Sequence, residues 1–243
     1  MKTVAMIPCR LGSERIPFKN LRYMGDELLC EWVIRKVTAI TFSEDIYINS
    51  ESDVFATIAK ENFAGFYQRP PELATADAKT DDFVYDFMKG TEMADDDILI
   101  LINPTSPLVS ANELGTGLHA FDEGDYNSMN TVVKHQIHAM RMDLGHPEGV
   151  NCDFDRKLQK TQDLNAIYTL AFAFMGWRVG PFKEAYERDG YALFNKPCYF
   201  HEVSGKTAIN KLSYEEDWEV VERILTGSYG PPRYHEAITR LVK

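Results

Sequence analysis

Short apolar runs alternate along this chain with segments whose apolar residues recur at helical spacing. The run Val4 to Ile7 is apolar at consecutive positions, as in a buried parallel strand, and Pro8 ends it. The run Ile98 to Ile102 is continuous and rich in β-branched residues, which predicts a central strand. Further strands are expected at 46–48, 65–67, 131–133 and 199–203, and helices at 28–37, 54–60, 80–88, 112–121 and 215–225.

This alternation predicts an α/β fold with a mostly parallel sheet covered by helices on both faces. Ligands of such sheets bind at the carboxyl ends of the strands, so the loops 9–20 and 103–109 are expected to lie near one another. The polar stretch at about 135–165 is too long for an ordinary connection and predicts a small lobe inserted into a single domain, 1–243. The pattern of 166–174 fits either a strand or a helix.

Charge and cysteine content narrow the possible partners. Lys and Arg number 26 against 37 Asp and Glu, a formal net charge of −11 that repels nucleic acid and anionic lipid. The four cysteines are scattered and form no C-x-x-C pair, as expected of reduced thiols in the cytoplasm. No apolar run approaches the roughly 20 residues that span a bilayer, and no export signal is expected. We therefore expect no nucleic-acid or membrane partner.

The first loop reverses the sign of the charge. Residues 8–22 carry Arg10, Arg15, Lys19 and Arg22 against one acid, a local balance of +3. Gly12 permits a positive φ and Ser13 adds a hydroxyl and an amide, so the loop could surround a polyphosphate. A solvated basic turn is the alternative. The spacing matches neither a Walker A loop nor the dinucleotide fingerprint, which leaves nucleotidyl transfer open.

Three segments together resemble one enzyme family. They are the first loop, ending in Lys19-Asn20-Leu21, the segment Arg69-Pro70-Pro71-Glu72-Leu73-Ala74 with Ala78-Lys79-Thr80 after it, and Asn103-Pro104-Thr105-Ser106-Pro107-Leu108. Their order resembles the acylneuraminate (CMP-sialic acid) cytidylyltransferase family, while the detail of the first loop resembles CMP-Kdo synthetases. The resemblance implies a Rossmann-like nucleotidyltransferase fold, a homodimer joined by the small lobe, and transfer of CMP from CTP to a sialic acid-like 2-keto sugar acid with release of pyrophosphate.

The resemblance also implies roles for individual residues. Those expected to act on the triphosphate are Arg10, Arg15 and Lys19; those expected to bind the nucleotide are Gly12, Ser13, Arg69, Ala78, Thr80 and Asn103; those expected to bind the acceptor are Tyr168 and Asn165. Asn103 stands where the family usually has Gln, which leaves Kdo, a related sugar acid or a phosphonate as alternative acceptors. Tyr168 is equally compatible with a core position.

The resemblance implies Mg²⁺, which the related enzymes hold with two aspartates before the last helix. The corresponding stretch, 208–218, has no Asp-x-Asp, and Asn210 is a weak candidate ligand. Three alternatives are open: CTP oxygens and water hold the metal, Lys211 partly replaces it, or the acceptor brings its own anionic group. A catalytically inactive nucleotide-binding regulatory protein is the alternative of another class.

Overall fold

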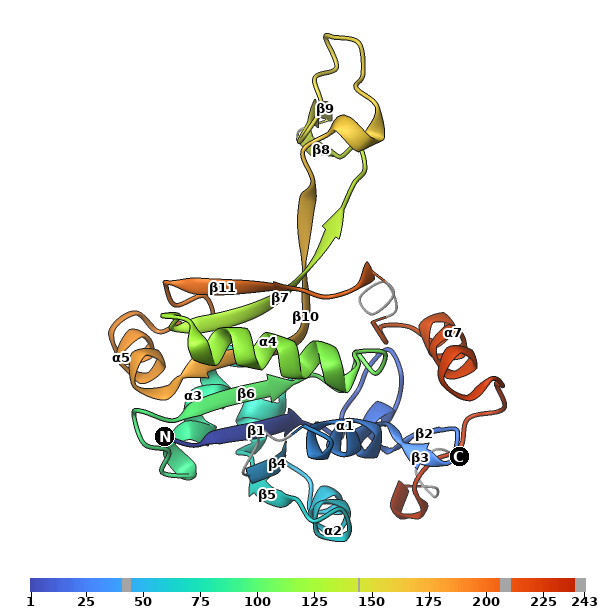
Figure 1. The fold of residues 1–243 in the computed structure, drawn as a ribbon. Helices are drawn as coiled ribbons and strands as arrows, with labels where there is room; N and C mark the ends of the chain where they lie inside the picture. The colour runs from blue at the N-terminus through green and yellow to red at the C-terminus, as the bar shows by residue number, and fades with distance from the viewer. Residues whose placement is uncertain (41–44, 144, 206–210, 239–243) are drawn as a thin grey trace.

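The computed structural model describes residues 1–40, 45–143, 145–205 and 211–238, and its centre is a seven-stranded sheet (Figure 1). The strand order is β11 (Cys198–Glu202), β7 (Ser128–His135), β10 (Ile167–Arg178), β6 (Ile98–Ile102), β1 (Thr3–Pro8), β4 (Asp45–Ser50) and β5 (Gly65–Gln68). Strand β10 runs antiparallel to β6 and β7, and every other neighbouring pair is parallel. The predicted mostly parallel sheet is confirmed, and the ambiguous run 166–174 lies almost entirely within β10.

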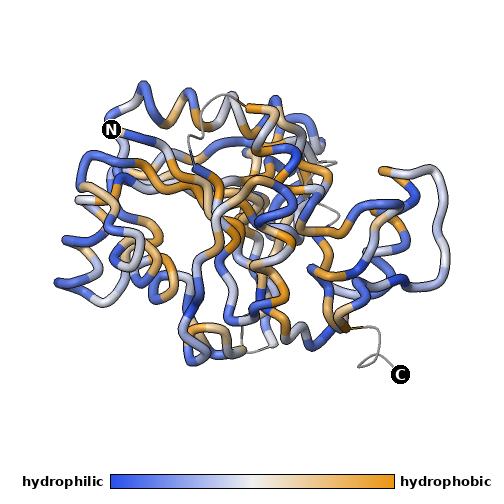
Figure 2. Tube along the Cα trace, turned by 90° about the horizontal axis from the view of Figure 1, so that it is seen from below, coloured by the Kyte–Doolittle hydropathy of each residue, from blue (hydrophilic) through white to orange (hydrophobic). Residues whose placement is uncertain are grey.

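Both faces of the sheet are buried, which explains the continuous apolar runs. In β6 the side chains of Ile98, Ile100 and Ile102 join one apolar cluster, whereas those of Leu99 and Leu101 join another, because successive strand residues point to opposite faces. The helices α1 (Leu29–Thr38), α2 (Val54–Glu61) and α4 (Ala111–Glu123) contribute to the first cluster, and α3 (Thr80–Gly90) and α5 (Val179–Asp189) to the second. Figure 2 shows apolar positions concentrated along the central strands.

Helix α5 was not predicted from the sequence. It begins at Val179-Gly180-Pro181, and of its 11 residues only Val179, Phe182 and Ala185 are buried, so its apolar stripe is too narrow to stand out from the polar positions. The five predicted helices are all present, each within a few residues of its expected bounds.

A separate apolar cluster positions the C-terminal part of the chain beside the first loop. Helix α7 (Glu215–Thr226) contributes Trp218 and Val221, which pack with Ile16 and Leu212. Short elements complete this side: η1 (Lys19–Leu21), η2 (Pro71–Ala74), η4 (Glu236–Ile238), β2 (Tyr23–Met24) and β3 (Glu27–Leu28). The packing of Ile16 against α7 fixes the end of the first loop.

The residues between β7 and β10 form an arm that stands away from the sheet (Figure 1). It carries the hairpin of β8 (Met140–Asp143) and β9 (His146–Gly149) and the short helix η3 (Thr161–Asp163). Several large apolar side chains on it are exposed, among them Ile137, Met140 and Met142. Within the described part of the chain, no helix has the length and apolar character needed to cross a bilayer.

Candidate active site

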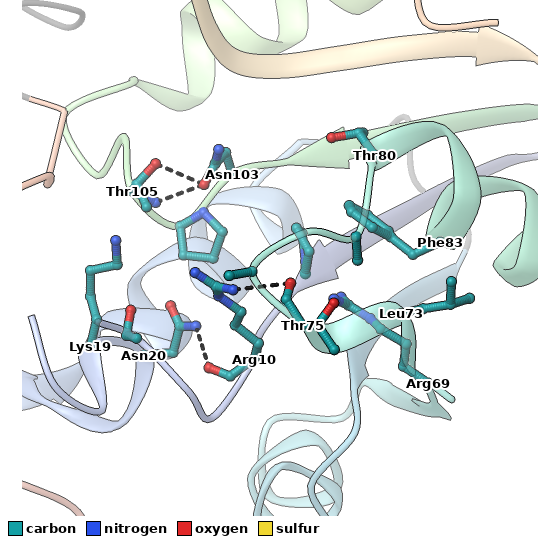
Figure 3. Close-up of a pocket in the computed structure, with 15 residues that line it drawn as sticks. Arg10, Lys19, Asn20, Arg69, Leu73, Thr75, Thr80, Phe83, Asn103 and Thr105 are labelled. Atoms are coloured by element: carbon teal, nitrogen blue, oxygen red, sulfur yellow. Dashed lines mark hydrogen bonds between the residues drawn. The ribbon is translucent and has the colours of Figure 1, made fainter. Parts of the chain in front are cut away.

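A cavity of about 350 Å³ opens at the carboxyl ends of β1 and β6 (Figure 3). Its lining residues come from three segments far apart in the sequence: Pro8, Arg10, Ser13, Lys19, Asn20, Arg69, Leu73, Thr75, Ala76, Ala78, Thr80, Phe83, Asn103, Pro104 and Thr105. The predicted approach of the first loop to the loop after β6 is therefore confirmed. Seven of the residues predicted to act on the triphosphate or bind the nucleotide lie around this one cavity.

The first loop directs two cations toward the cavity (Figure 3). Arg10 Nη1 donates a hydrogen bond to the Thr75 carbonyl oxygen at 3.2 Å, which links this loop to the segment after η2. Lys19 Nζ donates to the Leu212 carbonyl oxygen at 3.0 Å. Burial and the nearby charges of Arg15, Lys211 and Arg10 lower the pKa of Lys19 to about 8, although Asp217 opposes them. The site therefore concentrates positive charge.

Arg69 is a buried cation whose side chain is held on two sides. Its exposed fraction is 3%, and its Nε donates to Asn49 Oδ1 at 2.6 Å while Nη2 donates to the Asn49 carbonyl oxygen at 2.8 Å. The guanidinium lies over the Phe83 ring, 4.5 Å from its centroid. Burial lowers the pKa of Arg69 to about 10, so this group stays charged at neutral pH. An alternative for Arg69-Pro70-Pro71 is a stiff linker without a binding role. The contacts of the guanidinium favour a fixed binding group instead.

Asn103 is oriented by its own turn. Its Oδ1 accepts hydrogen bonds from the Thr105 backbone N at 3.1 Å and from Thr105 Oγ1 at 2.8 Å. Its backbone N donates to the Ala173 carbonyl oxygen of β10, which ties the turn to the sheet. Because the side-chain oxygen is engaged in the turn, the Nδ2 group is the end of this carboxamide available to a ligand in the cavity.

Four of the described residues singled out from the sequence do not line this cavity. Gly12 and Arg15 belong to the first loop but are exposed, and Arg15 lies over the Tyr214 ring at 5.2 Å. Tyr168, which is 55% exposed, and Asn165 lie at the base of the arm, so the core alternative for Tyr168 is wrong. Asn210 lies outside the described residues.

The backbone of the first loop turns at a different residue from the one expected. Gly12 has no positive φ, and a Cβ built there would meet no atom within 4 Å, so the backbone does not use the freedom that glycine permits at this position. Phe18 instead adopts the left-handed conformation, with φ of 50°, directly before η1. This turn brings Lys19 back toward the cavity.

Sequence reasoning missed two residues that shape the cavity from behind Arg69. Phe83 belongs to the apolar stripe of α3, and that stripe predicted a core position rather than a stacking contact with Arg69. Asn49 is fully buried near the end of β4. A polar residue near the carboxyl end of an otherwise apolar parallel strand is the signal that could have identified it.

Carboxylates are absent from the described residues that line this cavity. No Asp or Glu is among the cavity-lining residues, and the described part of the chain contains no group of three or more His, Cys, Asp and Glu side chains able to hold a metal. Mg²⁺ prefers carboxylate and phosphate oxygens and keeps several waters. The donor set here consists of cations, hydroxyls and amides.

A comparison with known protein families covers the part of the chain that forms the cavity. A sequence profile described as cytidylyltransferase matches residues 4–169, which include every residue that lines the cavity. The chain belongs to the cytidylyltransferase family. The three sequence segments that carried the resemblance therefore lie within the matched part, and the structure brings them to one cavity.

Among curated cytidylyltransferases, an N-acylneuraminate cytidylyltransferase of Streptococcus agalactiae is 25% identical over 172 residues, 69% of this chain and 41% of the relative. The 3-deoxy-manno-octulosonate cytidylyltransferase 2 of Hydrogenovibrio crunogenus is 24% identical over 127 residues, 52% of this chain and 50% of the relative. The chain thus spans about half the length of these relatives, or less.

Solved structures show the same fold over nearly the whole chain. A CMP:2-keto-3-deoxy-manno-octonic acid synthetase in complex with CTP matches with a TM-score of 0.67 at 11% identity, covering 93% of this chain and 99% of that one. A cytidylyltransferase from Leptospira borgpetersenii matches with a TM-score of 0.59 at 14% identity, covering 100% of this chain and 94% of that one. At these identities the comparison supports the fold, and the chemistry has to be argued from the cavity.

Proposed function

We propose that this protein binds CTP in the cavity and transfers CMP to an acidic 2-keto sugar of the sialic acid type, releasing pyrophosphate. The observation that carries the proposal is the convergence of Arg10 and Lys19 with the held Arg69 and with Asn103 around one cavity at the strand ends. Arg10 and Lys19 suit the anionic end of a ligand, whereas the held Arg69 and Asn103 suit a planar end that forms hydrogen bonds. CTP has both.

The proposed reaction is a single in-line displacement. The anomeric hydroxyl oxygen of the acceptor attacks the α-phosphorus of CTP, the bond from that phosphorus to the bridging oxygen breaks, and the hydroxyl loses its proton. Pyrophosphate leaves with the bridging oxygen. The roles of Arg10 and Lys19, and of Arg15 beside them, are to hold the triphosphate and to stabilise the charge that develops on pyrophosphate. Ser13, Ala78 and Thr80 line the space proposed for the nucleotide.

A Kdo-type sugar acid is the second candidate acceptor. The detail of the first loop favours it, and the matched relative from Hydrogenovibrio crunogenus is named for that sugar acid. Asn103 is the cavity residue that we expect to affect the choice, because its carboxamide is one methylene shorter than the usual Gln.

We further propose that two copies associate through the arm. Ile137, Met140, Met142 and Val150 are at least 50% exposed on a hairpin that contacts little else, and burial against a second copy would remove this apolar surface from water. Tyr168 and Asn165, at the base of the arm, would then be available to the neighbouring cavity. The exclusion of nucleic acid and membrane and the cytoplasmic location stay predictions from the sequence. Mg²⁺ stays a prediction from the family resemblance, and it would have to enter with CTP.

Pyrophosphate release with matched acceptors tests the function. Purified protein with CTP should release pyrophosphate in the presence of a sialic acid-type nonulosonate or Kdo, and not with a neutral aldose of similar size. Removing one electrostatic contact to the triphosphate, as in Arg10→Met, should reduce kcat/KM by about 100-fold. Lys60→Met is the matched control, because Lys60 is an exposed cation of α2 and does not line the cavity.

The result also separates an enzyme from a regulatory protein. CTP binding without pyrophosphate release with any sugar acid or phosphonate would contradict the proposed transfer and support nucleotide sensing. Absence of CTP binding would contradict both.

A further inference from the structure

A backbone segment from the C-terminal part of the chain contacts two residues that line the strand-end cavity. The Leu212 backbone N donates to the Thr105 carbonyl oxygen at 2.8 Å, and its own carbonyl oxygen accepts from Lys19 Nζ at 3.0 Å. Leu212 is 1% exposed and packs in the cluster beneath α7. Two cavity-lining residues therefore hold this residue by its backbone. The preceding residue, Lys211, is thereby kept close enough to the cavity for its charge to lower the pKa of Lys19.

Lys211 is a partly buried cation without a described carboxylate partner. Its Nζ lies 5.9 Å from the centroid of the Phe172 ring. Phe172 precedes Ala173, and the carbonyl oxygen of Ala173 accepts a hydrogen bond from the Asn103 backbone N. Among the residues that the structure describes, none forms a salt bridge with it. Burial and the nearby Arg15 lower the pKa of Lys211. A half-buried ammonium in this environment is stabilised by an anion brought from outside.

Two acidic groups of this C-terminal segment are already engaged. Asp217 is the acid whose charge raises the pKa of Lys19. Its carboxylate accepts hydrogen bonds from the Ser213 and Tyr214 backbone N at 2.8 and 2.7 Å. Glu215 pairs with the buried Arg22 at 2.7 Å. These carboxylates serve the start of α7 and the loop that packs against it, so the positive charge around the cavity is left for a ligand to neutralise.

The same charges do not fit a magnesium ion held by protein side chains. The cations Arg10, Arg15, Lys19 and Lys211 interact closely enough for the other three to lower the pKa of Lys19. A divalent cation placed among them would meet repulsion, and the lining offers no carboxylate to offset it. The sequence of residues 206–210, Lys-Thr-Ala-Ile-Asn, adds no acidic residue.

We propose that the protein binds the triphosphate of CTP through its own cations, with Lys211 supplying charge that a metal ion would otherwise provide, so that CTP binding does not require a divalent cation. The inference rests on the proposed function, because it takes CTP to be the ligand of the cavity. Lys211 acts here as a binding residue for the polyphosphate, held in place by the backbone contacts of Leu212.

Calorimetric titration of CTP in EDTA and in excess MgCl₂ tests the inference without relying on turnover. For the wild-type protein, Kd in EDTA should lie within about threefold of Kd in magnesium. Lys211→Met keeps the length of the side chain and removes its charge, and it should weaken CTP binding in EDTA about tenfold or more, the loss of one charge-assisted contact. Lys211→Arg should stay within about threefold of wild type.

Two controls separate a specific contact from a general charge effect. Lys60→Met removes an equal charge from α2, away from the cavity lining, and should leave both Kd values within about twofold of wild type. Titration with cytidine, which lacks phosphates, should give the same affinity for wild type and Lys211→Met. A loss of cytidine binding in Lys211→Met would show damage to the cavity rather than loss of a phosphate contact and would overturn the assignment.

The remaining outcomes are distinguishable. CTP binding that appears only with magnesium overturns the inference and leaves the proposed function intact. Equal CTP affinities for Lys211→Met and Lys60→Met overturn the role of Lys211. No CTP binding under either condition overturns the proposed function itself.

Discussion

Raising the pH from about 7 to about 9 should weaken CTP binding by removing the charge on Lys19. This ammonium lies in the cavity beside Arg10, Arg15 and Lys211, and burial together with those cations lowers its pKa to about 8. A lowered pKa means that the proton is lost as the pH rises through about 8, well below the usual range of a lysine. The charged form, which is the form that attracts phosphate, is therefore dominant at neutral pH and scarce at about pH 9.

The size of the effect follows from this pKa. With a pKa of about 8, roughly nine-tenths of the Lys19 side chains are charged at about pH 7 and roughly one-tenth at about pH 9. If only the charged form binds the triphosphate, the apparent Kd rises about tenfold over this range, or about 1.4 kcal/mol. The terminal phosphate of CTP loses its last proton near the lower end of this interval, a change that would strengthen binding as the pH rises and so does not produce the expected loss.

Calorimetric titration of CTP at fixed ionic strength across this range is the assay. Lys19→Arg keeps its charge throughout and should give a clearly shallower profile than the wild-type protein, because an arginine does not titrate here and Lys211 is then the remaining lysine with a lowered pKa. Lys60→Arg, a change on α2 outside the cavity lining, should keep the wild-type slope. A flat profile for the wild-type protein, or the same slope in Lys19→Arg, would refute the assignment of Lys19 to the triphosphate.

Three further predictions concern other parts of the structure. Asn103→Gln should change the ratio of kcat/KM for a sialic acid-type acceptor and Kdo by about fivefold or more, because the carboxamide moves by about 1.5 Å; an equal fall for both acceptors in pyrophosphate assays would contradict this. Phe83→Leu should weaken CTP binding by about three- to tenfold in calorimetry, because Arg69 loses the ring beneath it, and an unchanged Kd would count against that contact. Arg178 donates to the carbonyl oxygen of residue 122 in the last turn of α4 and to those of residues 124 and 126 just after it. Arg178→Ala should therefore lower the free energy of unfolding by about 3 kcal/mol in urea, whereas the exposed Arg156→Ala should change it by less than about 0.5 kcal/mol; equal effects would contradict the capping role.

The strands were predictable from sequence where burial is uniform. Residues Ile98 to Ile102 are apolar at every position because helices cover both faces of β6, and no surface strand would carry that pattern. The run 166–174 was ambiguous for the opposite reason. Strand β10 leaves the sheet for the arm and has a register shift between Leu170 and Met175, so its residues meet several environments and follow no single period.

Residue types and their places along the chain were enough to predict which charged and polar groups belong to the candidate site. The cations of the first loop, the segment beginning at Arg69 and the turn at Asn103 were identifiable because each follows directly from residue type and from its place after a strand. Their order along the chain also pointed to the cytidylyltransferase family, which the profile match over residues 4–169 confirms.

The distant groups that complete the candidate site could be identified only from the packing of the elements. Leu212 accepts a hydrogen bond from Lys19 across 193 positions of sequence, Asn49 and Phe83 hold Arg69, and Lys211 comes to the edge of the cavity instead of a carboxylate. Hydrophobic periodicity records which face of an element is buried, but not which other element buries it. The partners of these cations depend on which elements pack together. Here the packing of α7 against the first loop determines them.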